Sequence, residues 1–70
     1  MMPLTLADMG TAYTIKRVGG SQEVKKHLED LGFVVGGDVT VINVLGGNVI
    51  ANVKDTRVGI SRELAQKIMI

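Results

Sequence analysis

The sequence contains no cysteine, no tryptophan, one proline and only two aromatic side chains, Tyr13 and Phe33. Without cysteine the chain has no disulfide framework, no thiolate metal site and no cysteine nucleophile. This composition fits a reducing compartment, and we expect a cytoplasmic protein. The scarcity of aromatics argues against a surface that stacks nucleic-acid bases and against a groove for proline-rich peptides.

An excess of positive charge is also missing, since 8 Lys and Arg residues face 7 Asp and Glu residues, for a formal charge of +1. A small domain that grips a phosphate backbone normally carries a large basic excess, so we expect no strong nucleic-acid binding. The apolar runs are too short to span a bilayer, and residues 1–9 lack the pattern of a signal peptide. We therefore do not expect this chain to insert into a membrane.

The 70 residues allow one hydrophobic core, so we expect a single domain over residues 1–70. Apolar residues make up 46% of the chain and charged residues 21%, which favours a globular protein over a disordered one. Valine, isoleucine and methionine exceed what so small a core can bury, so some apolar surface should face a partner. The composition selects no particular oligomeric state.

One stretch has the periodicity of an α-helix. Ser21 can cap its first turn, where Glu23 also favours the helix dipole, and apolar residues then recur at i, i+4 and i+7: Val24, Leu28 and Leu31. Gly32 is a good left-handed residue for the end of this helix. The next residue, Phe33, should then fold back onto Leu28.

A β-hairpin is predicted from two β-branched runs, residues 39–45 and 49–54, joined at Gly46-Gly47-Asn48. Alternation would place Val39, Val41 and Leu45 on one face of the first run, with Ile42 and Val44 on the other. Because both faces of that run are apolar, it should be a central strand. In the second run the alternation separates Val49, Ala51 and Val53 from Ile50, Asn52 and Lys54.

The remaining segments complete a small sheet. We expect one helical turn after a Thr5 cap, then a strand over residues 12–18 with a bulge near Lys16-Arg17. A turn at Asp55-Thr56 should lead into a strand over 57–60, a short turn capped by Ser61 and a closing strand over 68–70. The predicted fold is mostly β with short helices (α+β): a small barrel of about five strands, one helix inserted after the first strand, and a short helical turn before the last.

Few residues could carry out chemistry. His27 is the one side chain with a near-neutral intrinsic pKa, and Glu23 and Asp30 lie within reach of it on the predicted helix. A lasting metal site needs three or four convergent ligands, so an ordinary surface or half-buried histidine is favoured over a metal ligand. The Gly19-Gly20 doublet before the helix lacks the spacing of a phosphate loop. We expect no enzyme activity and no resident cofactor.

The order of landmarks along the chain is more specific than any single motif. A helix runs into Leu31-Gly32-Phe33 with Gly36 after it, and the chain ends on Val58-Gly59-Ile60-Ser61 and Leu64-Ala65-x-x-Ile68-x-Ile70. This sequence resembles the FeoA family over nearly its entire length. The resemblance implies an SH3-like barrel and a small cytoplasmic partner of FeoB, the bacterial ferrous iron transporter, with no catalytic residues. One departure is that Lys25 or Lys26 stands where the family commonly has an arginine.

For the surface that meets the transporter, we select five residues: Lys25, Lys26, Leu28, Phe33 and Met69. Leu28 and Phe33 could equally be core residues. The alternative function is a nucleic-acid-associated or regulatory barrel, because the resemblance extends to the C-terminal module of iron-dependent repressors. A third hypothesis is transient Fe²⁺ binding at His27.

Overall fold

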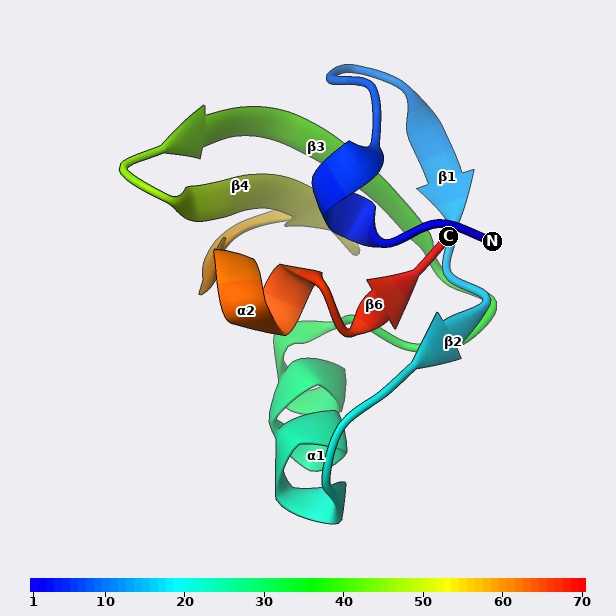
Figure 1. Cartoon of the computed structure of the whole chain (residues 1–70). Coiled ribbons are helices and arrows are strands. Elements are labelled where there is room, and N and C mark those ends of the chain that lie inside the picture. Colours follow the sequence, from blue (N-terminus) through cyan, green and yellow to red (C-terminus); the bar gives the residue numbers. More distant parts are fainter.

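The computed structural model describes all residues, 1–70. It is mostly β with two short helices, as predicted, and all strand pairs are antiparallel. Strands β1, β3, β4 and β5 form one sheet in the order β1-β3-β4-β5, and β2 pairs with β6 in a second. In chain order the elements are η1 (Leu4–Leu6), β1 (Ala12–Thr14), β2 (Arg17–Val18), α1 (Gln22–Leu31), β3 (Asp38–Leu45), β4 (Asn48–Val53), β5 (Thr56–Ser61), α2 (Arg62–Ala65) and β6 (Ile68–Met69) (Figure 1).

The structure has six strands rather than about five, because the predicted strand over residues 12–18 is two strands in different sheets. The break falls at Ile15, whose side chain is buried and whose N–H donates to the carbonyl of Gly37 (2.8 Å). The next residue, Lys16, instead donates to the carbonyl of Met69 (2.8 Å). The chain thus passes from one sheet to the other here, which a bulge within one strand does not describe. The two sheets do not close into a single continuous barrel.

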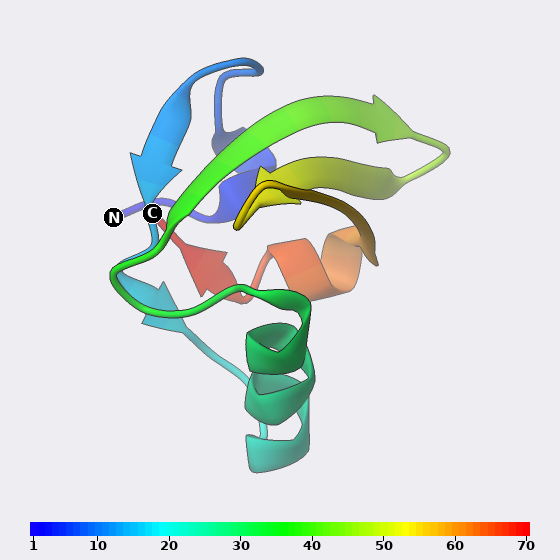
Figure 2. The ribbon, with the colours of Figure 1, turned by 180° about the vertical axis from the view of Figure 1, so that it is seen from behind.

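Helix α1 confirms the predicted helix and both of its ends. The N–H of Val24 donates to Ser21 Oγ (3.3 Å), and Gly32 has a left-handed φ of 110°. The N–H of Gly32 donates to the carbonyl of Glu29 and that of Phe33 to the carbonyl of Leu28, which together form a Schellman motif. This motif turns Phe33 back into the core. Figures 1 and 2 both show α1 projecting from the rest of the molecule, away from the tip of the β3–β4 hairpin.

The β3–β4 hairpin and the central position of β3 are also confirmed. Its turn residues Gly46 and Gly47 have φ of 56° and 83°, as a type I′ turn requires. The predicted placement of Leu45 on the same face as Val39 and Val41 is wrong. A bulge between Val41 and Asn43 inserts one residue and reverses the alternation, so Leu45 is exposed.

Two local predictions are also corrected. The first helical turn is the 3₁₀ turn η1, which follows Pro3 without a side-chain cap, so Thr5 lies within it and does not begin it. The second hairpin turns at Lys54-Asp55, one residue earlier than predicted, and both residues have positive φ. Because β4 ends at Val53, the strand that follows already begins at Thr56.

The core lies between the four-stranded sheet and the elements that cover it. In Figure 1, η1, α2 and β6 lie in front of the sheet. Ser61 Oγ accepts from the N–H of Leu64 (3.2 Å), which confirms the predicted cap of α2. The closing strand β6 pairs with β2, and its other side is bridged by Pro3. Thirteen apolar side chains form this core: Leu4, Ile15, Leu28, Phe33, Val39, Val41, Val49, Ala51, Val53, Ile60, Ala65, Ile68 and Ile70.

Candidate partner-binding surfaces

The structure does not bring the five predicted partner residues together. Leu28 and Phe33 are each 0% exposed, so the alternative that both are core residues holds in this structure. Their burial follows from the Schellman motif, which directs both side chains inward. Lys26 is exposed and Lys25 half-buried on α1, whereas the half-buried Met69 lies on β6 between β2 and the Pro3 segment. Lys25 and Lys26 thus belong to a different element from Met69.

His27 lies on the exposed side of α1, with Glu23 one turn before it and Asp30 nearly one turn after it. The structure contains no group of three or more His, Cys, Asp or Glu side chains placed to hold a metal ion. An imidazole with at most two carboxylates nearby offers fewer ligands than the three or four of a lasting site. No helix of the structure combines the length and the apolar character needed to cross a bilayer.

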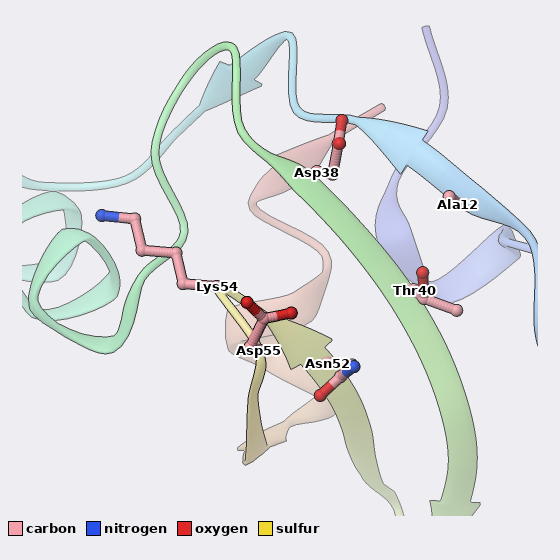
Figure 3. Close-up of a pocket in the computed structure, with 6 residues that line it drawn as sticks. All are labelled: Ala12, Asp38, Thr40, Asn52, Lys54 and Asp55. Atoms are coloured by element: carbon pink, nitrogen blue, oxygen red, sulfur yellow. The ribbon is translucent and has the colours of Figure 1, made fainter.

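One hollow lies on the outer face of the four-stranded sheet (Figure 3). It has a volume of about 390 Å³, and the cross-strand register sets Ala12, Thr40 and Asn52 side by side across β1, β3 and β4. Figure 3 shows the Lys54 ammonium pointing away from the two carboxylates of the hollow, those of Asp38 and Asp55. The result is a polar, oxygen-rich surface in which every side chain can remain hydrated. It can hydrogen-bond a polar group, but no buried group selects one.

A second hollow, which we call the hairpin pocket, lies between the end of the β3–β4 hairpin, η1 and α2. Its volume is about 270 Å³, and it is lined by Thr5, Val44, Gly47, Val49 and Arg62. The Gly46-Gly47 turn and the Ser61 cap position this site, because the N–H of Arg62 donates to the carbonyl of Gly47 (3.1 Å). That bond joins the first residue of α2 to the turn of the hairpin.

Exposed apolar side chains occur in the hairpin pocket and on segments that adjoin it. Val44 is 48% exposed in the wall, and Leu6, the residue after Thr5, is 65% exposed. Leu45 is 59% exposed on the opposite face of the hairpin, because it pairs with Asn48 whereas Val44 pairs with the buried Val49. The sequence predicted that some apolar surface would remain exposed, but it selected α1 and Met69 instead of this region. The sequence feature that could have indicated this region is an apolar residue directly before a Gly-Gly turn, Leu45-Gly46-Gly47. The bulge that exposes Leu45 has no signature in the sequence.

The fold belongs to the class of small SH3-like domains. A structure of FeoA from Stenotrophomonas maltophilia, complexed with zinc and described as an SH3 domain protein, superposes with a TM-score of 0.82 at 23% identity, covering 99% of this chain and 88% of the other. An iron uptake regulatory protein (FeoA) superposes with a TM-score of 0.88 at 24% identity, covering 97% and 90%. These likenesses establish the fold.

The family follows from the sequence itself. The family model described as the FeoA domain matches residues 2–70, and this chain belongs to the FeoA domain family. A protein of Methanocaldococcus jannaschii that bears the name Fe(2+) transport protein A is 31% identical over 70 residues, covering 100% of this chain and 85% of its own. The chain is thus a member of a family involved in ferrous iron transport.

The same fold also occurs inside larger regulators. The structure of ScaR with bound Cd²⁺ superposes with a TM-score of 0.85 at 20% identity, covering 97% of this chain but 33% of ScaR. At this identity the likeness concerns the fold alone. It shows that an SH3-like domain of this kind also serves as one part of a longer protein.

Proposed function

We propose that this chain is a non-enzymatic accessory protein of ferrous iron uptake, which binds a cytosolic surface of a FeoB-type transporter and modulates its activity. The match of the FeoA domain model to residues 2–70 carries this proposal. The exposed apolar side chains of the chain, among them Val44 in the hairpin pocket, support it, because exposed apolar surface on a small domain is typical of a protein interface. The proposal locates the protein in the cytoplasm, with Fe²⁺ as cargo of the transporter.

Amide NMR titration of the isotopically labelled chain tests the proposed partner. The probe is the purified nucleotide-binding cytosolic part of the FeoB-type transporter of the same organism, added with and without a GTP analogue. We expect signal changes confined to one patch of the surface. An unchanged spectrum at high probe concentration would refute binding to this part of the transporter.

The predicted contact surface on α1 and β6 has its own test. We expect Lys26→Glu and Met69→Asp to lower ferrous iron uptake in cells that depend on this chain, if Lys25, Lys26 and Met69 contact the transporter. Both substituted side chains have solvent-accessible surface, so the variants should retain the fold. Full uptake by two folded variants would show that the contact lies elsewhere.

The second candidate function is that of a regulatory or nucleic-acid-associated domain, favoured by the fold shared with ScaR and with a manganese-dependent transcriptional repressor. The formal charge of +1 argues against a large phosphate-binding surface. A filter-binding assay with DNA and RNA at low salt separates the two candidates. Micromolar, salt-sensitive binding would favour this second function over the first.

Transient Fe²⁺ binding at His27 is a further proposal about the same chain. Exposed imidazole and carboxylate groups on α1 could contact the ion in passing. Under anaerobic conditions, His27→Ala should then abolish Fe²⁺ binding measured by calorimetry. If the variant binds as much Fe²⁺ as the original chain, His27 is not the ligand.

A further inference from the structure

The apolar character of the hairpin pocket comes from Val44 and Val49, a cross-strand pair of β3 and β4. Val49 forms the floor at 3% exposed, and its cross-strand partner Val44 forms a wall that remains half exposed. The outer neighbour of β3, strand β1, reaches only as far as the pair Ala12 and Thr40. Strand β3 therefore extends beyond β1 at this end and presents apolar side chains to solvent.

Arg62 gives this apolar hollow a positive charge. It is the only charged residue that lines the pocket, and its side chain makes none of the side-chain hydrogen bonds of the structure. Its backbone is held on both sides, by the Ser61 cap of α2 and by the bond to the carbonyl of Gly47. A guanidinium on an anchored backbone beside apolar surface favours a carboxylate, with which it can form two parallel hydrogen bonds.

The size of the pocket limits its occupant. Its volume of about 270 Å³ is below the roughly 300–1,000 Å³ of pockets that bind whole small molecules or cofactors. A single apolar side chain together with an adjacent carboxylate fits this volume better. Addition of a whole strand to the open edge of β3 is disfavoured, because the N–H of Val44 already donates to Asn43 Oδ1 (2.8 Å).

We infer that the hairpin pocket is the docking site for the transporter, and that it receives an apolar side chain adjacent to a carboxylate on the transporter's cytosolic surface. The inference rests on the proposed function, because it names the surface through which that function is carried out. Charge complementarity selects an acidic segment as the occupant, and the half-exposed Val44 supplies the apolar contact. Arg62 is then the residue whose replacement weakens binding most.

The chemistry of the pocket is testable without the transporter. The probes are N-acetyl-leucine, which carries an apolar side chain and a carboxylate, and N-acetyl-leucinamide, which lacks the charge. We expect N-acetyl-leucine to shift the amide signals of Val44, Gly47, Val49 and Arg62 at millimolar concentration, and the amide to bind at least fivefold more weakly. Equal binding of the two compounds, or shifts spread over the whole surface, would overturn the inference.

Charge reversal tests the pocket against the transporter itself. Arg62→Glu should weaken binding of the cytosolic part of the transporter at least tenfold by calorimetry. The backbone bond to Gly47 does not depend on the side chain, and glutamate is well tolerated in the first turn of a helix, so the fold should persist. Arg57→Glu is the matched control, because it makes the same charge change on the exposed, opposite end of β5. It should bind like the original chain.

The outcomes separate the site from the proposed partner. If Arg62→Glu and Arg57→Glu bind the transporter equally well, the pocket is not the docking site, although the proposed function stands. If the original chain does not bind the transporter but N-acetyl-leucine shifts the pocket signals selectively, the proposed partner is wrong and the pocket serves another acidic partner. If Lys26→Glu abolishes binding and Arg62→Glu does not, the docking surface lies on α1.

Discussion

The two halves of strand β3 have similar sequences and different surroundings. Its first half, which contains Val39 and Val41, pairs with β1 on one side and β4 on the other, and both of these side chains are buried. Its second half, from Ile42 to Leu45, lies beyond the end of β1, and all of its side chains are exposed. A β-branched, apolar strand thus becomes core only where other elements cover it.

The two halves of β3 also differ in their roles: the first half stabilises the fold, and the second half forms part of the proposed docking site. The first half contributes to the hydrophobic core, because its valines contact the covering elements. The second half contributes little burial and presents Val44 at the hairpin pocket. Mutations in the first half should therefore lower the stability of the fold, whereas mutations in the second half should leave it nearly unchanged and affect the hairpin pocket.

The largest expected effect comes from placing a charge in each half. Val39→Asp buries an unpaired carboxylate at a cost of more than about 4 kcal/mol, comparable with the roughly 3–5 kcal/mol that so small a core supplies, so the chain should unfold. Val44→Asp should change the free energy of unfolding by no more than about 0.5 kcal/mol, since its side chain is already half solvated. Urea denaturation followed by circular dichroism measures both. Equal destabilisation by the two variants would show that the two halves of β3 contribute equally to stability.

The turn that closes the exposed half should show an intermediate effect. Gly47→Ala forces an L residue into positive φ and should destabilise the chain by about 1–2 kcal/mol. The reverse change, Asp55→Gly, removes an L residue from positive φ in the other hairpin turn and should stabilise the chain by up to about 1 kcal/mol. Thermal unfolding of the two variants checks the signs, and a loss of stability in Asp55→Gly would show that the Asp55 side chain stabilises its turn.

The smallest expected effect is at the open edge of β3. Asn43→Ala removes the hydrogen bond from the N–H of Val44 and should cost about 0.5–1 kcal/mol. Asn52→Ala is the matched control, because Asn52 is also exposed and makes no side-chain hydrogen bond. Hydrogen exchange at Val44 reports the local change directly. Equal exchange rates at Val44 in Asn43→Ala and in the original chain would show that the bond does not protect this edge.

Much of the fold follows from local sequence signals. Helix α1 with its Ser21 cap and its Gly32 end, the Gly46-Gly47 hairpin and the Ser61 cap of α2 are all confirmed. Each of these depends on the conformational preference of one or two residues and on a bond to a near neighbour in the chain. Such features are visible without knowledge of the rest of the molecule.

The errors share a different origin. The change of sheet at Ile15 and the exposed Leu45 both depend on which distant segments pair with each strand. The predicted partner residues illustrate the same limit, since the folded chain buries Leu28 and Phe33 and leaves Lys26 and Met69 on separate elements. Local pattern gives the conformation of a segment but does not give its neighbours.

Residue identity and short spacing are enough to specify the helix, its caps, the glycine turns, the β-rich class and the membership of the FeoA domain family. Three features depend on the folded chain: β3 extends beyond β1, a bulge exposes Leu45, and Arg62 and Val44 line the same pocket. The physical reason is that strand pairing and the packing of α2 against the hairpin join residues far apart in the chain. No local preference encodes their register.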